Sequence, residues 1–200
     1  VADMGYSACY SQMGYSFVAA ADLERAVDYL SRVSLHARRC GNILALAHTT
    51  IELARISLLL GRLEQAETIC RDELSLTEQA SYADYPAFCL VHLALANVLR
   101  EKKAWDEAEQ HLWQGLETAQ KSGHQYYLAQ GYLIAARLHH AQGKTDQVQD
   151  DMRKAEKIAA SIHNRFLNDA IAQNWQSLKG KALPAQSLIE PLSERELEVL

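Results

Sequence analysis

The chain has 200 residues, 48% of them hydrophobic, and a formal charge of −5 at pH 7. This acidic balance excludes a basic nucleic-acid-binding surface, so the segment is not expected to hold DNA by itself. The sequence contains neither 18 consecutive apolar residues nor a basic-then-apolar leader, which favours a cytoplasmic protein with no membrane partner.

The composition is that of an all-α protein. Only three prolines and nine glycines occur, and strand-like alternation of β-branched residues is missing. The spacing of apolar residues predicts long helices over 6–20, 43–60, 86–102 and 126–142, each followed by a turn and a second helix. Pro86 is expected in the first helical turn of its segment, where its missing N–H costs nothing.

Four segments of the sequence resemble one another, and each spans one of these turns. They begin at Ala20, Leu60, Lys102 and Gln142. A small or apolar residue recurs within them after 40, 42 and 40 residues, at Ala26, Ala66, Ala108 and Val148. A fixed period in this range is typical of a solenoid in which each repeat is a pair of helices.

The residues within each repeat fit such a pair. Gly61 and Gly143 suit the left-handed conformation that ends a helix. A last helix over 164–178 is expected to cover the exposed end of the array. The four cysteines lack a C-x-x-C spacing and are expected to be reduced, mostly buried thiols: Cys9, Cys40, Cys70 and Cys89.

This pattern resembles the tetratricopeptide repeat (TPR), with a small residue inside the first helix, a glycine at the turn and an alanine in the second helix. The small positions of the first helices are Gly14, Ala54, Ala96 and Ala136. The period is longer than the roughly 34 residues usual in that family. The resemblance implies an all-α superhelical solenoid of TPR-like helix pairs over residues 1–178, with repeats near 6–40, 43–80, 86–123 and 126–163 and a capping helix over 164–178.

The end of the chain carries a second resemblance. Residues 192–200 read "LSERELEVL", in which Ser193 and Glu196 have the spacing of a capping box that starts a helix. The segment resembles the start of the LuxR-type helix-turn-helix DNA-binding domain, and 179–191 is interpreted as a linker.

TPR-like repeats followed by such a domain resemble the large ATP-dependent transcriptional regulators of the MalT class. That resemblance implies an effector-sensing segment that signals to a C-terminal DNA-binding domain. Its partners would be a small-molecule effector or a regulatory protein, with self-association, and DNA would be bound only through the missing domain. No cofactor is expected in the segment itself, and ATP would belong to an upstream domain. The alternative is a general protein–protein interaction scaffold without a small-molecule ligand.

The register predicts which residues line the concave face of the solenoid. One residue past each small position lies a polar row, namely Tyr15, Arg55, Asn97 and Arg137, and nearby on the same faces lie His48, Arg100, Gln130 and His140. Arginine and aromatic groups suit sugars, carboxylates and phosphates. The competing interpretation is that these are ordinary solvated or inter-repeat residues.

No enzymatic chemistry is predicted. His36 and Cys40 lie one helical turn apart, but no second pair completes a metal site. No phosphate-binding glycine motif occurs, so this segment should not bind ATP. Trp105 and Trp113 are expected to pack in the core or between repeats, with a partner-binding groove as the minority interpretation.

Overall fold

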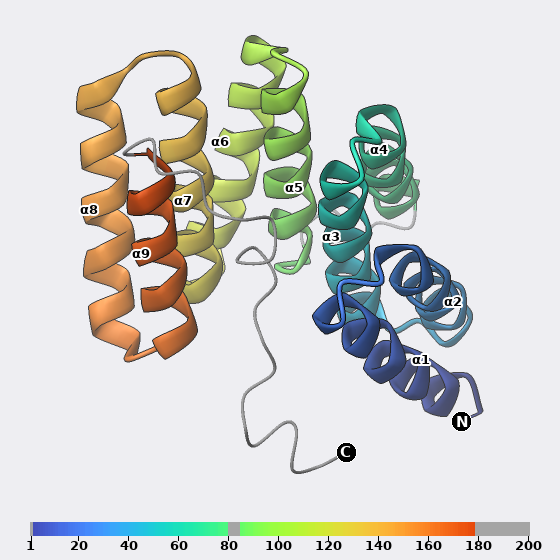
Figure 1. The fold of residues 1–200 in the computed structure, drawn as a ribbon. Helices are drawn as coiled ribbons and strands as arrows, with labels where there is room; N and C mark the ends of the chain where they lie inside the picture. Colours follow the sequence, from blue (N-terminus) through green and yellow to red (C-terminus); the bar gives the residue numbers. More distant parts are fainter. Residues whose placement is uncertain (1, 80–84, 179–200) are drawn as a thin grey trace.

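In the computed structural model, residues 2–79 and 85–178 are described, and they fold into α-helices connected by short turns, with no strand among them (Figure 1). The helices are α1 (Ala2–Ala19), α2 (Leu23–Cys40), α3 (Ile43–Leu59), α4 (Leu63–Gln79), α5 (Phe88–Glu101), α6 (Trp105–Lys121), α7 (Gln125–Ala141), α8 (Thr145–Ile162) and α9 (Arg165–Leu178). The predicted all-α solenoid is confirmed. The expected linker and the LuxR-like segment at 179–200 lie outside the described residues.

Consecutive helices form antiparallel pairs, α1–α2, α3–α4, α5–α6 and α7–α8, and α9 packs on both α7 and α8. Two helix starts differ from expectation, since α1 begins at Ala2 instead of residue 6 and α5 begins at Phe88 instead of Pro86. Pro86 lies in the turn before α5, not in its first turn, because the amides of Phe88 and Cys89 bond the carbonyls of Tyr85 and Pro86 at three-residue spacing. The chain therefore tightens into a short 3₁₀-like turn before the α-helix begins.

Left-handed residues connect the helices of every pair. Gly61 and Gly143 have φ of +72° and +74°, as predicted for the residue that ends a helix. Ala21 and Lys103 occupy the equivalent turns with φ of +59° and +60°, although they are not glycines. All four turns thus use the same backbone conformation, and at Ala21 and Lys103 that conformation is strained.

The small residues of the first helices let the two helices of a pair approach closely. An added Cβ at Gly14 would lie 2.8 Å from the Leu30 side chain of α2. Ala54, Ala96 and Ala136 are at most 1% exposed. The repeated positions of the second helices are equally buried, namely Ala26, Ala66, Ala108 and Val148, followed one turn later by Leu30, Cys70, Leu112 and Met152.

The first helices of successive pairs also pack on one another. α3 contacts α5, α5 contacts α7, and α7 contacts α9, whereas no two second helices are among the helix pairs in extensive contact within 2–79 and 85–178. We call α3, α5, α7 and α9 the inner row, and α2, α4, α6 and α8 the outer row. Close contact on one side only curves the array toward the inner row.

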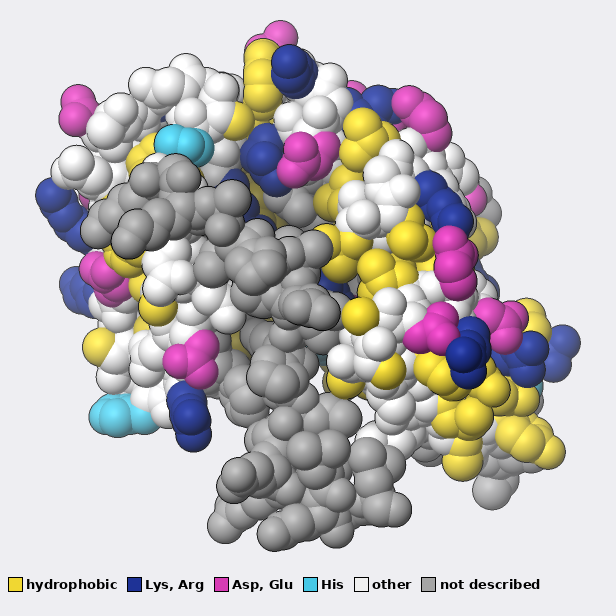
Figure 2. Space-filling model, in the orientation of Figure 1, with side chains coloured by type: hydrophobic (Ala, Val, Ile, Leu, Met, Phe, Trp, Pro, Cys, Tyr) yellow, Lys and Arg dark blue, Asp and Glu magenta, His cyan; other side chains and the backbone are white. Residues whose placement is uncertain are grey.

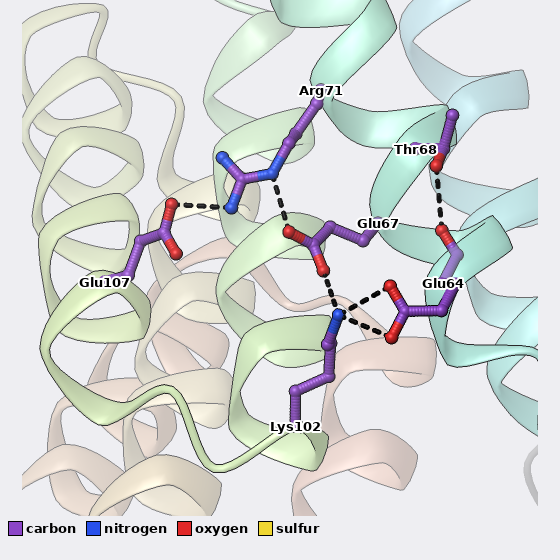
Figure 3. Close-up of polar contacts among 6 residues, drawn as sticks. All are labelled: Glu64, Glu67, Thr68, Arg71, Lys102 and Glu107. Carbon is purple, nitrogen blue, oxygen red and sulfur yellow. Dashed lines mark hydrogen bonds and ion pairs between the residues drawn. The ribbon is translucent and has the colours of Figure 1, made fainter.

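Ion pairs connect successive repeats along the outer row (Figure 3). Lys102 Nζ, in the turn after α5, lies 2.8 Å from Glu64 Oε2 and 2.6 Å from Glu67 Oε2 of α4. Arg71 of α4 binds Glu67 at 2.7 Å and Glu107 of α6 at 2.6 Å. The neighbouring junctions carry Arg62 with Glu24 and Lys144 with Glu109. We call these contacts the outer ion pairs.

Candidate functional site

The predicted polar residues lie on the first helices, as their register requires. Tyr15 is on α1, His48 and Arg55 are on α3, Asn97 and Arg100 are on α5, and Gln130, Arg137 and His140 are on α7. Seven of them are partly buried, and His140 is exposed. They do not form one continuous row, because neighbouring side chains divide them into separate groups.

The first group joins α1 and α3. Arg55 donates to Glu52 Oε2 through Nε at 3.1 Å and Nη2 at 2.7 Å. Burial raises the pKa of Tyr15 to about 12, with the negative charge of Glu52 adding to the effect and Arg55 opposing it. Tyr15 is therefore a neutral hydroxyl at pH 7. The cation of Arg55 is already matched by a carboxylate from its own helix.

An aromatic group follows at the N-terminal ends of α3 and α7. The rings of His48 and Tyr127 are 6.3 Å apart, and His124 stacks on Tyr127 at 5.0 Å. Burial lowers the pKa of His48, against the opposing charge of Glu52, so its imidazole is neutral at pH 7. On α7, Gln130 Nε2 donates to the Tyr126 hydroxyl at 3.3 Å. This group offers flat surfaces and neutral donors of the kind that bind sugars or aromatic side chains.

The third group lies toward the C-terminal ends of α5 and α7, and we call Arg100 and Arg137 the arginine pair. Arg100 donates to Asn97 Oδ1 at 3.1 Å and to Glu101 Oε1 at 2.5 Å. Arg137 Nε donates to Asn174 Oδ1 of α9 at 2.6 Å. Burial lowers the pKa of Arg137 to about 10, with the nearby charge of Arg100 adding to the effect and Glu101 opposing it. Arg137 remains a cation at pH 7.

Glu101 and Asn174 complete the third group and were not predicted from the sequence. Glu101 directly follows Arg100. One period of 40 residues after Arg137 falls at 177, and Asn174 lies one helical turn before that position. The period could therefore have pointed to Asn174, whereas its contact with Arg137 depends on how α9 packs on α7. His140 lies at the exposed end of α7 and is not grouped with any of the other seven residues.

Trp113 corrects one expectation. Its side chain is 67% exposed on α6, so it does not pack in the core or between repeats, whereas Trp105 is partly buried against the central core. The buried face of α6 is formed by Ala108, Leu112, Gly115, Leu116 and Ala119. Trp113 follows Leu112 by one residue, about 100° around the helix, and therefore points away from that face.

Two partly buried histidine contacts were also not predicted. His92 of α5 and His111 of α6 bring their Nδ1 atoms within 3.0 Å, and His139 Nδ1 lies 2.6 Å from Asp151 Oδ2 across α7 and α8. Burial, with some contribution from the charge of His111, lowers the pKa of His92 to about 4. The described residues contain no group of three or more His, Cys, Asp or Glu side chains arranged for a metal ion.

One hollow of the surface does not coincide with these groups. A shallow, open depression of about 450 Å³ lies beside the first turn and is lined by Ala20, Ala21, Asp22, Leu23, Glu24 and Leu60. It includes none of the predicted residues, and an open hollow of this kind holds no small molecule firmly. We therefore place the candidate site on the inner row, where charged and aromatic side chains converge from several helices.

Hydrophobic side chains also reach the surface, over α1 and over α3 (Figure 2). They include Tyr6, Met13 and Leu44, which are 53%, 42% and 47% exposed. None of the described helices is both long enough and apolar enough for a bilayer crossing.

Comparisons with known proteins agree with this architecture. BtubC from P. vanneervenii is 15% identical with a TM-score of 0.55, and the match covers 100% of this chain and 92% of that one. The TPR-like repeats of a candidate kinesin light chain from Podosopora anserina are 16% identical with a TM-score of 0.58, covering 97% and 95% of the two chains. No curated protein sequence matches. At this identity the likeness concerns the fold alone.

The profile of one protein family matches nearly the whole chain. It is described as the MalT-like TPR region, and the match runs over residues 5–185. The TPR-like repeat fold is typically a non-catalytic scaffold for interaction or sensing. The chain belongs to the MalT-like TPR region family.

Proposed function

We propose that this chain is the effector-sensing segment of a LuxR-type transcriptional regulator and has no enzymatic activity of its own. The observation that carries the proposal is the inner row, along which α3, α5, α7 and α9 contribute separate groups of charged, aromatic and amide side chains. The outer ion pairs connect the repeats without using these groups. A polar inner surface of this kind is a ready binding site for a small ligand or for a segment of a partner protein.

Family membership and the end of the sequence support the regulatory part of the proposal. The chain matches the MalT-like TPR region, and residues 192–200 resemble the start of a LuxR-type DNA-binding domain. In this proposal DNA is bound only through that domain, ATP belongs to an upstream domain, and the protein acts in the cytoplasm. Effector binding would shift the equilibrium between two states of the array, which requires different affinities for the two states.

A thermal-shift screen tests the sensing role directly. The library should contain sugars, sugar phosphates, amino acids and acyl compounds. A ligand at 100 times its Kd stabilises the native state by about 2.7 kcal/mol. Arg55→Ala and Arg137→Ala report on the first and third groups separately, and Arg153→Ala on the exposed face of α8 is the matched control. A folded protein that responds to no compound would contradict a small effector and leave the interaction scaffold.

The gene sequence beyond the codon for Leu200 tests the regulatory role. A turn followed by a second helix and a basic recognition helix is expected. A stop codon, or a further helix pair of the same period, would contradict the DNA-binding role and leave the inner row as a surface for protein partners.

A further inference from the structure

We propose that the arginine pair binds the carboxylate or phosphate group of a small anionic effector. This inference rests on the proposed sensing function and adds the chemical class of the ligand. The site comprises Arg100 and Arg137 with Asn97, Glu101 and Asn174, contributed by α5, α7 and α9 of the inner row.

Several side-chain N–H groups of the arginine pair and of Asn97 are available to donate hydrogen bonds to a ligand. In the described part of the chain, Arg137 uses only Nε, which donates to Asn174, and neither of its Nη atoms donates to another residue. Arg100 uses Nε and Nη2, which leaves Nη1. Asn97 accepts through Oδ1 and has its Nδ2 donor left. Guanidinium groups with two adjacent N–H groups available bind carboxylates and phosphates in a forked arrangement.

The site has more positive than negative charge. Among the residues that the structure describes, Glu101 forms an ion pair with Arg100 alone, and its side chain is 46% exposed, whereas the side chain of Arg100 is only 18% exposed. The partner of Arg137 is a neutral amide, and no carboxylate among the described residues lies within ion-pair distance of it. Burying a cation without a counter-charge is unfavourable, so an added anion would stabilise this part of the array.

The outer ion pairs show that this imbalance is local. Lys102, two residues after Arg100, lies between the carboxylates of Glu64 and Glu67. Arg71 likewise contacts two carboxylates. Arg100 lies in the last turn of α5, where the helix carbonyls favour a cation, but Arg137 lies before the last turn of α7 and lacks that compensation. The structure therefore pairs its cations closely on the outer row and leaves the arginine pair short of negative charge.

Thermal unfolding of the 200-residue chain with simple anions tests the proposal. Sodium phosphate and sodium succinate serve as probes, with sodium chloride at equal ionic strength as the reference. We expect the Tm to rise with the concentration of phosphate or succinate beyond the effect of chloride. Arg137→Gln and Arg100→Gln should each weaken the apparent affinity about tenfold or more, because each removes charge-assisted hydrogen bonds. Arg153→Gln, an exposed arginine on α8, should leave it unchanged.

A second signature separates this site from a general ionic effect. The Nε–H group of Arg137 is held by Asn174 and should give a distinct signal in a ¹H–¹⁵N NMR spectrum, which should move as phosphate or succinate is added. Equal stabilisation of wild type and both arginine variants, or no response to either anion, would overturn the inference. If neutral sugars stabilise the protein while neither anion does, the sensing function stands and the anion site is wrong.

Discussion

The interior pair α5–α6 and the end pair α1–α2 have the same design but very different surroundings. α5 packs on α3, α4, α6 and α7, and nine of its residues are buried. Among the described helices, α1 packs extensively only on α2, and it leaves Tyr6 and Met13 exposed. In a solenoid the neighbours of a repeat provide much of its stability, so equivalent positions in the two pairs should respond very differently to substitution.

The largest difference is expected at the core. Leu93 of α5 is 1% exposed, and its side chain lies where Gly115 and Gly131 allow close approach. Leu93→Ala should lower the free energy of unfolding by about 4 kcal/mol, through lost burial and the cavity left behind. Met13→Ala in the end pair should cost less than about 0.5 kcal/mol. Urea denaturation followed by circular dichroism measures both, and similar losses would remove the distinction between the pairs.

The second largest effect is expected at low pH, which should lower the stability of the interior pair. The unfolded chain protonates His92 near pH 6.5, whereas the folded protein, in which the pKa of His92 is about 4, does not. Lowering the pH between these values therefore favours unfolding. The free energy of unfolding should fall by about 3 kcal/mol at most. The measurement is the free energy of unfolding from pH 7 to pH 4. His92→Gln should flatten this dependence.

A third contrast uses glycines within helices. An added Cβ at Gly115 would lie 2.7 Å from Leu93 Cγ and 2.9 Å from the Cys89 carbonyl oxygen, whereas at Gly5 it would meet no described side chain or neighbouring helix within 4 Å. Gly115→Ala should destabilise the protein by about 2 kcal/mol because the backbone of α5 must move. Gly5→Ala should stabilise α1 by about 0.5 kcal/mol. Thermal melts of the two variants should therefore shift in opposite directions.

The smallest contrast concerns the outer ion pairs. Glu67 accepts from both Lys102 and Arg71, and its side chain is 16% exposed. The hydrogen bond from Lys102 is the main cause of the lowered pKa of Glu67. The stability that ionised Glu67 contributes is therefore lost as the pH falls from the ordinary pKa of a glutamate toward this lowered pKa. Glu67→Gln should cost about 1 kcal/mol at pH 7. Glu24 pairs with Arg62, but its side chain is 63% exposed, so Glu24→Gln should cost almost nothing. Equal losses in urea titrations would contradict the difference between the two junctions.

Much of the fold follows from one period in the sequence. Recurrence after 40, 42 and 40 residues identified the helix pairs, the left-handed turns at Gly61 and Gly143 and the small residues that let the helices meet. These features depend on local geometry and on burial that repeats from pair to pair, which is why sequence alone could predict them.

The site was harder to predict because it depends on partners from other repeats. The register placed Arg55 and Arg137 in one row, but Arg55 is paired with Glu52 of its own helix, whereas Arg137 meets Asn174 of α9. Trp113 was misplaced for a related reason. A large apolar side chain was assigned to the core without regard to which face of α6 was already filled.

The one-sided contact between helix pairs has a mechanical consequence. The helices of the inner row touch directly, while the outer row is connected at its junctions by long side chains such as Arg62 and Lys102. Long side chains change rotamer easily, so each junction bends most readily about the inner row. Small rotations in the same direction add up from pair to pair. A small change in the angle between neighbouring pairs at α5 therefore becomes a large displacement between α1 and α9.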